Sequence, residues 1–143
     1  MFLSTLDDHG AAPALVKSLA FSEARLKMIA ENVANATTPG YRAKQLDVSA
    51  FRTSLRRALD DRGTNLDKPL LVESGQQVRT DREGYLQVSP VEKPVENLLF
   101  HDGTNFSIEQ EMADLAETGM SHALATNLLQ RHYDGLRRAI RGV

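Results

Sequence analysis

The sequence predicts a mainly α-helical protein in which long N- and C-terminal helices pair as a coiled-coil-like layer around an irregular, partly β-strand and loop, middle insert. At both ends of the chain, apolar residues recur with alternating steps of four and three, which is the spacing of a heptad repeat. The middle instead contains glycines and prolines between short apolar runs, which is typical of loops and hairpins. We therefore expect an N-terminal helical arm over 1–35, a turn and insert over 36–106, and a C-terminal helix over 107–143.

The first helix is predicted to run from Ala12 to Ala34 and to be about 34 Å long at 1.5 Å per residue. Pro13 suits a first helical turn, Asn35 suits a left-handed cap, and Pro39 prevents the helix from continuing. One face of this helix is apolar apart from a single serine. Its heptad stripe consists of Leu15, Leu19, Ser22, Leu26, Ile29 and Val33.

The C-terminal helix is predicted to be longer, about 50 Å. Ser107 and Gln110 form a capping-box pattern at its start, and Arg138 and Arg141 with Gly142 suit its carbonyl end. The same stepping places a second stripe along it, apolar at both ends and interrupted in the middle. This stripe consists of Ile108, Met112, Leu115, Gly119, His122, Thr126, Leu129, Tyr133, Leu136 and Ile140.

Between the helices, a short helix is predicted over 50–60, and β-like runs over 70–72 and 85–88 favour loops with a candidate hairpin. Such a region buries little apolar surface of its own. We therefore expect the two heptad stripes to be exposed until partner helices cover them, which favours an assembly subunit over an enzyme.

Composition excludes several other classes. The 143 residues fit one domain, and a net charge of −2 argues against binding to nucleic acid or to anionic membranes. The chain has no cysteine for disulfides or thiolate metal sites. No run of 18 apolar residues predicts membrane insertion, and the first ten residues lack the pattern of a cleaved signal peptide.

No residue set predicts catalysis, a cofactor or a metal. The four histidines lack ligand spacing, and no glycine-rich phosphate loop occurs. His101, Asp102 and Ser107 invite a hydrolase interpretation, but no strand-turn-helix context accompanies them. A candidate basic patch is interleaved with Asp47, Asp60 and Asp61, which favours a solvated helix face over a basic binding surface. Its basic residues are Arg42, Lys44, Arg52, Arg56 and Arg57.

The corner after the first helix is the most distinctive stretch. Its polar and turn-forming residues are Asn32, Asn35, Thr38, Pro39, Gly40 and Tyr41. Pro39 followed by Gly40 favours a type II turn, in which glycine takes a positive φ. We expect Asn32 to bond freed helix carbonyls or turn amides, and Tyr41 to contribute a ring and a hydroxyl.

The stretch AENVANATTPGY, residues 30–41, resembles the ANNIANADTPGY signature of bacterial flagellar rod and hook proteins, with Glu31 and Thr37 as departures. DGTNFSIEQEM, residues 102–112, and the ending from Leu129 to Ile140 resemble proximal rod members of that family. The resemblance covers both ends of the chain, whereas the insert over 62–100 resembles no known pattern.

The resemblance implies a non-enzymatic structural subunit of the proximal rod in the flagellar basal body. Such subunits leave the cell through the flagellar type III export apparatus without a cleaved signal peptide, pack helically in the periplasmic rod and transmit torque from the motor. The implied neighbours are other copies of the chain, the FliE adaptor and the proximal rod proteins FlgC and FlgF. A non-flagellar coiled-coil adaptor is the alternative, and a hydrolase using His101 or Asp102 is a more distant one.

The resemblance and the heptad spacing together select two sets of assembly residues. The motif set is Asn32, Asn35, Thr38, Pro39, Gly40 and Tyr41. The helix-packing set is Leu15, Leu19, Leu26, Ile29, Val33, Ile108, Met112, Leu115, Leu129, Tyr133, Leu136 and Ile140.

Overall fold

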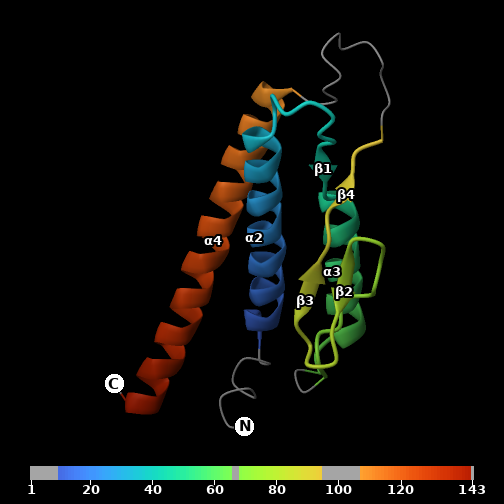
Figure 1. Ribbon diagram of the computed structural model, residues 1–143. Helices are drawn as coiled ribbons and strands as arrows, with labels where there is room; N and C mark the ends of the chain where they lie inside the picture. The colour runs from blue at the N-terminus through green and yellow to red at the C-terminus, as the bar shows by residue number, and fades with distance from the viewer. Residues whose placement is uncertain (1–9, 66–67, 95–106, 143) are drawn as a thin grey trace.

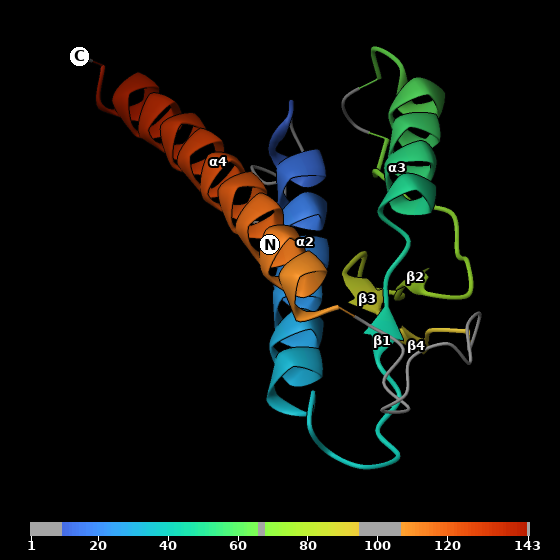
Figure 2. The same ribbon diagram turned by 90° about the horizontal axis from the view of Figure 1, so that it is seen from above.

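The computed structural model describes residues 10–65, 68–94 and 107–142 and is mainly helical, as predicted. Figures 1 and 2 show three layers, with α2 between α4 on one side and α3 with the short strands on the other. In chain order the elements are α2 (Ala12–Ala34), β1 (Lys44–Gln45), α3 (Val48–Arg62), β2 (Val78–Thr80), β3 (Leu86–Val88), β4 (Val91–Glu92) and α4 (Ile108–Arg141).

Helices α2 and α4 are antiparallel and make the most extensive contact of any pair of elements. Asn32 near the end of α2 bonds to Glu111 at the start of α4. At the other end, a Cβ built on Gly10 would lie 3.7 Å from the ring of His132. Because α4 has 34 residues and α2 has 23, α4 is about 16 Å longer and its last turns extend beyond α2.

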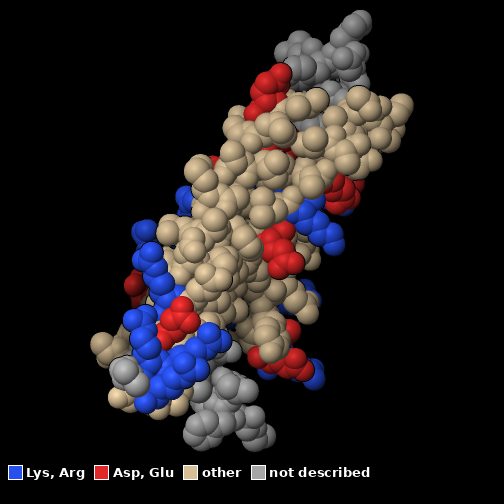
Figure 3. Space-filling model, turned by 90° about the vertical axis from the view of Figure 1, so that its left-hand side faces the viewer, with Lys and Arg blue, Asp and Glu red and all other residues tan. Residues whose placement is uncertain are grey.

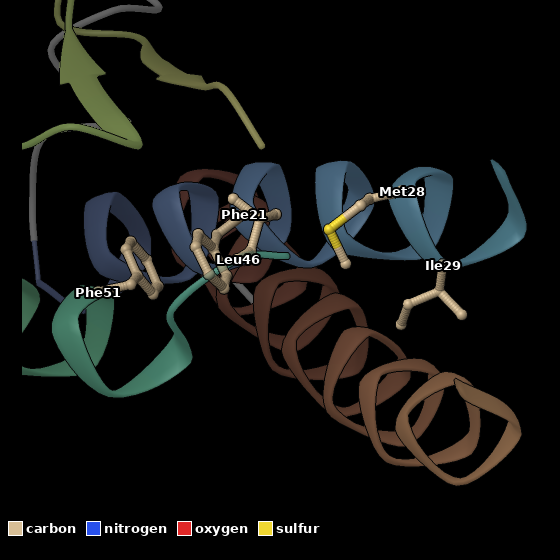
Figure 4. Packing of buried hydrophobic residues seen from close by; sticks show 5 residues of the cluster. All are labelled: Phe21, Met28, Ile29, Leu46 and Phe51. Carbon is tan, nitrogen blue, oxygen red and sulfur yellow. The ribbon is translucent and has the colours of Figure 1, made fainter. Parts of the chain in front are cut away.

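The apolar core lies mainly between α2 and the insert. Phe21 of α2 stacks on Phe51 of α3 with ring centroids 4.1 Å apart. Met28 and Leu46 join this cluster, and Ile29 lies on the side of α2 that faces α4 (Figure 4). The insert therefore buries more apolar surface than the sequence led us to expect, and it covers a face of α2 outside the predicted stripe.

The insert contains the short helix that the sequence predicts, extended to Val48–Arg62. Asp47 caps it, because its carboxylate accepts a hydrogen bond of 2.9 Å from the backbone N–H of Ala50. A hairpin is also present, although only one of the two predicted runs takes part in it: β3 lies within 85–88 and pairs antiparallel with β2, with Val78 opposite Val88. Residues 70–72 form no strand, yet Leu70 and Val72 are buried against α3.

Pairing between β1 and β4 is a feature that the sequence did not predict. Lys44 lies opposite Glu92, and the Lys93 backbone N–H donates to the Ala43 carbonyl at 2.8 Å. This small antiparallel sheet anchors the chain just after the corner to the chain just before residue 95. It thereby holds Lys44 and Lys93 next to the contact between α2 and α4.

Two predicted helix caps are wrong. Ser107 precedes α4 but makes no capping hydrogen bond, because its hydroxyl donates to the Glu109 carboxylate at 2.6 Å. Gln110 bonds to Asp114 one turn ahead instead of reaching back. Asn35 has φ −103° and is not left-handed. The predicted glycine end of α4 is confirmed, with Gly142 at φ 71°.

Candidate assembly site

The motif residues surround one buried side chain, Asn32, which has no exposed surface. Its Oδ1 accepts hydrogen bonds from the Tyr41 hydroxyl at 3.0 Å and from the Lys44 backbone N–H at 2.9 Å. Its Nδ2 donates to the Lys44 carbonyl at 2.9 Å and to Glu111 Oε2 at 3.2 Å. Asn32 thus uses both donors and both acceptor positions of its amide, which is how a buried amide avoids a desolvation cost.

Glu111 supplies the link from this network to α4. Its side chain is 1% exposed, and its Oε1 accepts from Lys93 Nζ at 2.7 Å. A buried carboxylate is unfavourable unless it is paired and hydrogen-bonded, and both conditions hold here. Through Asn32 and Glu111, the end of α2, the corner, β1, the chain after β4 and the start of α4 meet in a single network, which we call the motif network.

The corner itself has the predicted turn. The Tyr41 N–H donates to the Thr38 carbonyl at 3.2 Å, and Gly40 has φ +75°. Proline at the second position and a positive φ at the third define a type II turn. The turn sends the chain back along α2, so that Tyr41 and Lys44 reach Asn32.

The two asparagines divide their roles differently from our expectation. Asn35, not Asn32, bonds a carbonyl at the helix end, since its Nδ2 donates at 2.9 Å to the Glu31 carbonyl, which also accepts from the Asn35 backbone N–H. The Asn32 side chain instead occupies the place of a neighbouring strand beside Lys44, because it bonds both the backbone N–H and the backbone C=O of Lys44. That role depends on a residue twelve positions away, so helix-end reasoning could not find it.

The electrostatics of the motif network keep the Tyr41 hydroxyl protonated. Burial and the nearby Glu31 carboxylate raise the pKa of Tyr41 above its ordinary value of 10.0. Lys44 Nζ donates to Glu31 at 2.6 Å, and this hydrogen bond raises the pKa of Lys44. The tyrosine therefore remains a donor to Asn32, and the lysine remains a cation, at neutral pH.

Further along the two helices, the polar interruptions of the predicted stripes face each other. The Ser22 hydroxyl donates to the Leu19 carbonyl at 2.9 Å and lies 2.8 Å from His122 Nδ1. Because a hydroxyl has a single proton, Ser22 can make both hydrogen bonds only when His122 donates from Nδ1. Arg25 and Asp114 add an ion pair of 3.4 Å across the same contact.

The predicted stripe on α4 lies along the contact with α2, but the most buried residues of this contact lie one position before half of the predicted ones. Leu115, His122, Leu129 and Leu136 are partly buried, as expected for one half of the stripe. The other half consists of Glu111, Thr118 and Ala125, which are 1%, 2% and 7% exposed. The prediction had named Met112, Gly119 and Thr126 for these places. Gly119, Thr126 and also Tyr133 are partly buried, whereas Met112 is 52% exposed.

The ends of the predicted α4 stripe also lie outside the contact with α2. Ile108 is 49% exposed and Ile140 is 75% exposed. Ile108 lies in the first turn, and Ile140 lies on the overhang, where α2 has already ended. The stripe on α2 contacts its neighbours more fully, since Ile29 is buried and Leu15, Leu19, Leu26, Val33 are partly buried. Whether either set contributes to assembly stays a prediction.

Other candidate sites receive no support. Within residues 10–65, 68–94 and 107–142, no group of three His, Cys, Asp or Glu side chains is placed to hold a metal ion. In the same ranges, no helix is both long enough and apolar enough to cross a membrane. His101 and Asp102 lie outside the described residues. Arg52, Arg56 and Arg57 of α3 are exposed, and Arg52 and Arg57 lie near Glu117 and Glu73.

Comparison with known proteins identifies the family of the chain. A family model described as flagella basal body rod protein matches residues 19–42, which include Asn32 and the turn. The flagellar basal body rod protein FlgB of Borrelia hermsii is 31% identical over 120 residues, covering 82% of this chain and 85% of the relative. No solved structure matches significantly. The chain belongs to the flagellar basal body rod proteins, the family that includes FlgB, and the resemblance inferred from its sequence is confirmed.

Proposed function

We propose that this chain is a structural subunit of the proximal rod, which assembles helically through α2 and α4 and transmits torque from the motor. The family places the chain in the flagellar basal body rod. The motif network supports the finer assignment, because it joins Asn32 of the N-terminal family motif to Glu111 of the C-terminal one. The two signatures of the chain thus hold its two long helices to each other.

A torque-transmitting subunit has to resist sliding of one helix along the other. Apolar contacts alone permit alternative registers, whereas a buried polar pair satisfied in only one arrangement favours that register. Asn32 with Glu111, Ser22 with His122 and Arg25 with Asp114 are three such pairs along one helix contact. We infer that they fix the register of α2 against α4 while the rod turns.

The proposal also names the neighbours of the subunit in the rod and its export route. The contacts are with further copies of the chain, the FliE adaptor and the proximal rod proteins FlgC and FlgF, in the periplasmic part of the basal body. Export proceeds through the flagellar type III apparatus. The proposed role is structural and involves no catalysis. The family membership supports a structural role in the basal body rod, and the individual neighbours and the export route are part of the proposal.

Complementation tests the proposed function. In the bacterium that carries the gene, deletion should abolish the rod beyond the inner-membrane ring and abolish swimming. Expression of the wild-type chain should restore both, and the chain should be present in purified basal bodies. A chain that accumulates as a discrete oligomer and is absent from basal bodies would instead favour the adaptor alternative.

A further inference from the structure

An open apolar groove lies between the first turns of α2 and the β2–β3 hairpin, on the side of α2 away from α4 (Figures 1 and 2). Its volume is about 280 Å³. Val16, Leu71 and Tyr85 line it and are 37%, 57% and 63% exposed. Figure 3 shows the α4 side of the molecule, where Lys and Arg side chains gather towards the end of α4. The groove is therefore separate from that charged surface, and its exposed large side chains mark a contact site.

The groove offers apolar surface and few free polar groups. Lys17 is part of its lining, but this residue is buried and its Nζ donates to the Gly84 carbonyl at 2.8 Å. The other charged lining residue, Glu83, is exposed. The volume lies near the lower end of the range for small-molecule sites, about 300–1,000 Å³. We therefore expect apolar side chains to occupy the groove, not a charged ligand.

The chain enters α2 at the edge of this groove. Pro13, in the first turn of α2, is part of the lining. Three residues earlier, the Gly10 carbonyl accepts a hydrogen bond of 3.5 Å from Arg62, and a Cβ built on Gly10 would lie 3.7 Å from the His132 ring. Contacts with α3 and α4 thus hold Gly10 in place. Residues 1–9, which lie outside the described residues, precede a fixed point within one helical turn of the groove.

The composition and the length of residues 1–9 fit the groove. Four of the first six residues are apolar, namely Met1, Phe2, Leu3 and Leu6. The eight residues between Phe2 and Gly10 span at most about 26–29 Å when extended. Ala20, the most distant α2 residue of the groove, lies only about 12 Å along the helix from Ala12. Phe2 can therefore reach every part of the groove that α2 lines.

We propose that residues 1–6 of the same chain fill this groove, with Phe2 inserted between Val16, Leu71 and Tyr85. A tethered segment acts at an effective concentration in the mM range, which favours the chain's own residues over those of another molecule. Packing of Phe2 on the Tyr85 ring removes apolar surface of both side chains from water. The inference goes beyond the proposed function, because the contact lies within one subunit and does not need the rod.

Tryptophan fluorescence tests the inference, because the chain has no native tryptophan. In the isolated 143-residue chain, Phe2→Trp should emit at a shorter wavelength than the matched control Thr53→Trp, whose site on α3 is exposed. Acrylamide should quench Phe2→Trp several-fold less than it quenches Thr53→Trp.

Substitutions in the groove provide the second arm. Leu71→Asp and Tyr85→Asp, each added to Phe2→Trp, should raise quenching to the level of Thr53→Trp, because an incoming apolar side chain would desolvate the new carboxylate. Both replaced side chains are more than half exposed, so the fold should persist, which circular dichroism checks. Met120→Asp, at a similarly exposed apolar residue on α4, is the matched control and should leave quenching low.

Three outcomes would overturn the inference. The first is equal quenching of Phe2→Trp and Thr53→Trp, which would show that Phe2 stays in solvent. The second is protection that survives both groove substitutions, which would place the segment elsewhere. The third is protection of Phe2→Trp/Leu71→Asp after addition of a Phe2→Asp/Leu3→Asp chain, whose groove is open, since the occupant would then come from a second copy. Each outcome leaves the proposed rod function standing, because that function is tested separately in basal bodies.

Discussion

The two ends of the contact between α2 and α4 are built in opposite ways. At the motif end, where α2 finishes and α4 begins, polar side chains are buried: Asn32 has no exposed surface and Glu111 only 1%. At the distal end, where α4 extends past α2, an apolar side chain is exposed, with Ile140 75% exposed. Ordinary burial preferences are reversed at both ends.

The difference indicates which end serves the fold and which remains open for other contacts. Burying an amide and a carboxylate costs free energy unless every partner is present, so the motif end is stable in only one arrangement. Exposing an isoleucine on a solvent-facing overhang forgoes burial that a neighbouring chain could supply. The motif end therefore defines the subunit, and the distal end is available to join it to others.

The largest effect is expected at the centre of the motif end. Asn32→Ala leaves the Lys44 backbone groups and the Glu111 carboxylate without their partner, and should lower the free energy of unfolding by about 3–5 kcal/mol. Urea unfolding followed by circular dichroism measures this loss. Asn35→Ala removes one helix-end bond and one exposed bond of 3.4 Å from the Thr38 hydroxyl, and should cost about 1 kcal/mol. Equal losses in the two variants would contradict a special role for the motif network.

At the distal end, substitutions of buried and of exposed residues of the predicted stripe should change the free energy of unfolding by different amounts. Leu129→Ala removes a partly buried side chain and should cost about 2–3 kcal/mol in the isolated chain. Ile140→Ala should leave the unfolding free energy unchanged, because its side chain is already in solvent. If Ile140→Ala nevertheless reduces rod assembly in cells, the overhang acts between subunits. A matching loss of stability in both variants would show that the overhang packs within the chain.

The turn that delivers the chain to Asn32 should tolerate only glycine at its third position. Gly40→Val forces a β-branched residue to φ +75° and should cost roughly 1–2 kcal/mol, measured as a lower urea midpoint. Gly63 is no neutral comparison, since it also has a positive φ of 55°. Gly75, with open space around it and no positive φ, is the suitable control. If Gly75→Val is destabilised as much as Gly40→Val, the positive φ of the turn does not explain the loss of stability.

The smallest effect should be a pH dependence confined to the motif end. The pKa of Tyr41 is raised above 10.0, so its contribution to stability is complete below that pH and is lost as pH rises through the higher folded-state pKa. Deprotonation removes the donor to Asn32 and adds a negative charge near Glu31 and Glu111. Unfolding midpoints of the wild type and Tyr41→Phe should therefore converge in strongly alkaline buffer. A constant difference between them across pH would contradict this.

The sequence alone was sufficient for local features. The bounds of α2, the positive φ at Gly40, the glycine end of α4, the short helix after residue 47 and the strand β3 depend on residues close to each other in the chain. Proline fixes φ and glycine permits a positive φ within the turn itself, and heptad spacing acts within one helix, so neighbouring residues contain the needed information. The family resemblance also came from two local motifs.

Only the tertiary structure decided which side of α4 is buried. Apolar residues lie on more than one side of this helix, so periodicity favoured Met112 and Thr126 over Glu111 and Ala125. Burial of Glu111 becomes favourable only because Asn32, 79 residues away, and Lys93 satisfy its oxygens. The same holds for Asn32, whose partners in β1 and α4 are brought together by the fold. Whether a polar residue is buried depends on its distant partners, and the local spacing of residues carries no information about those partners.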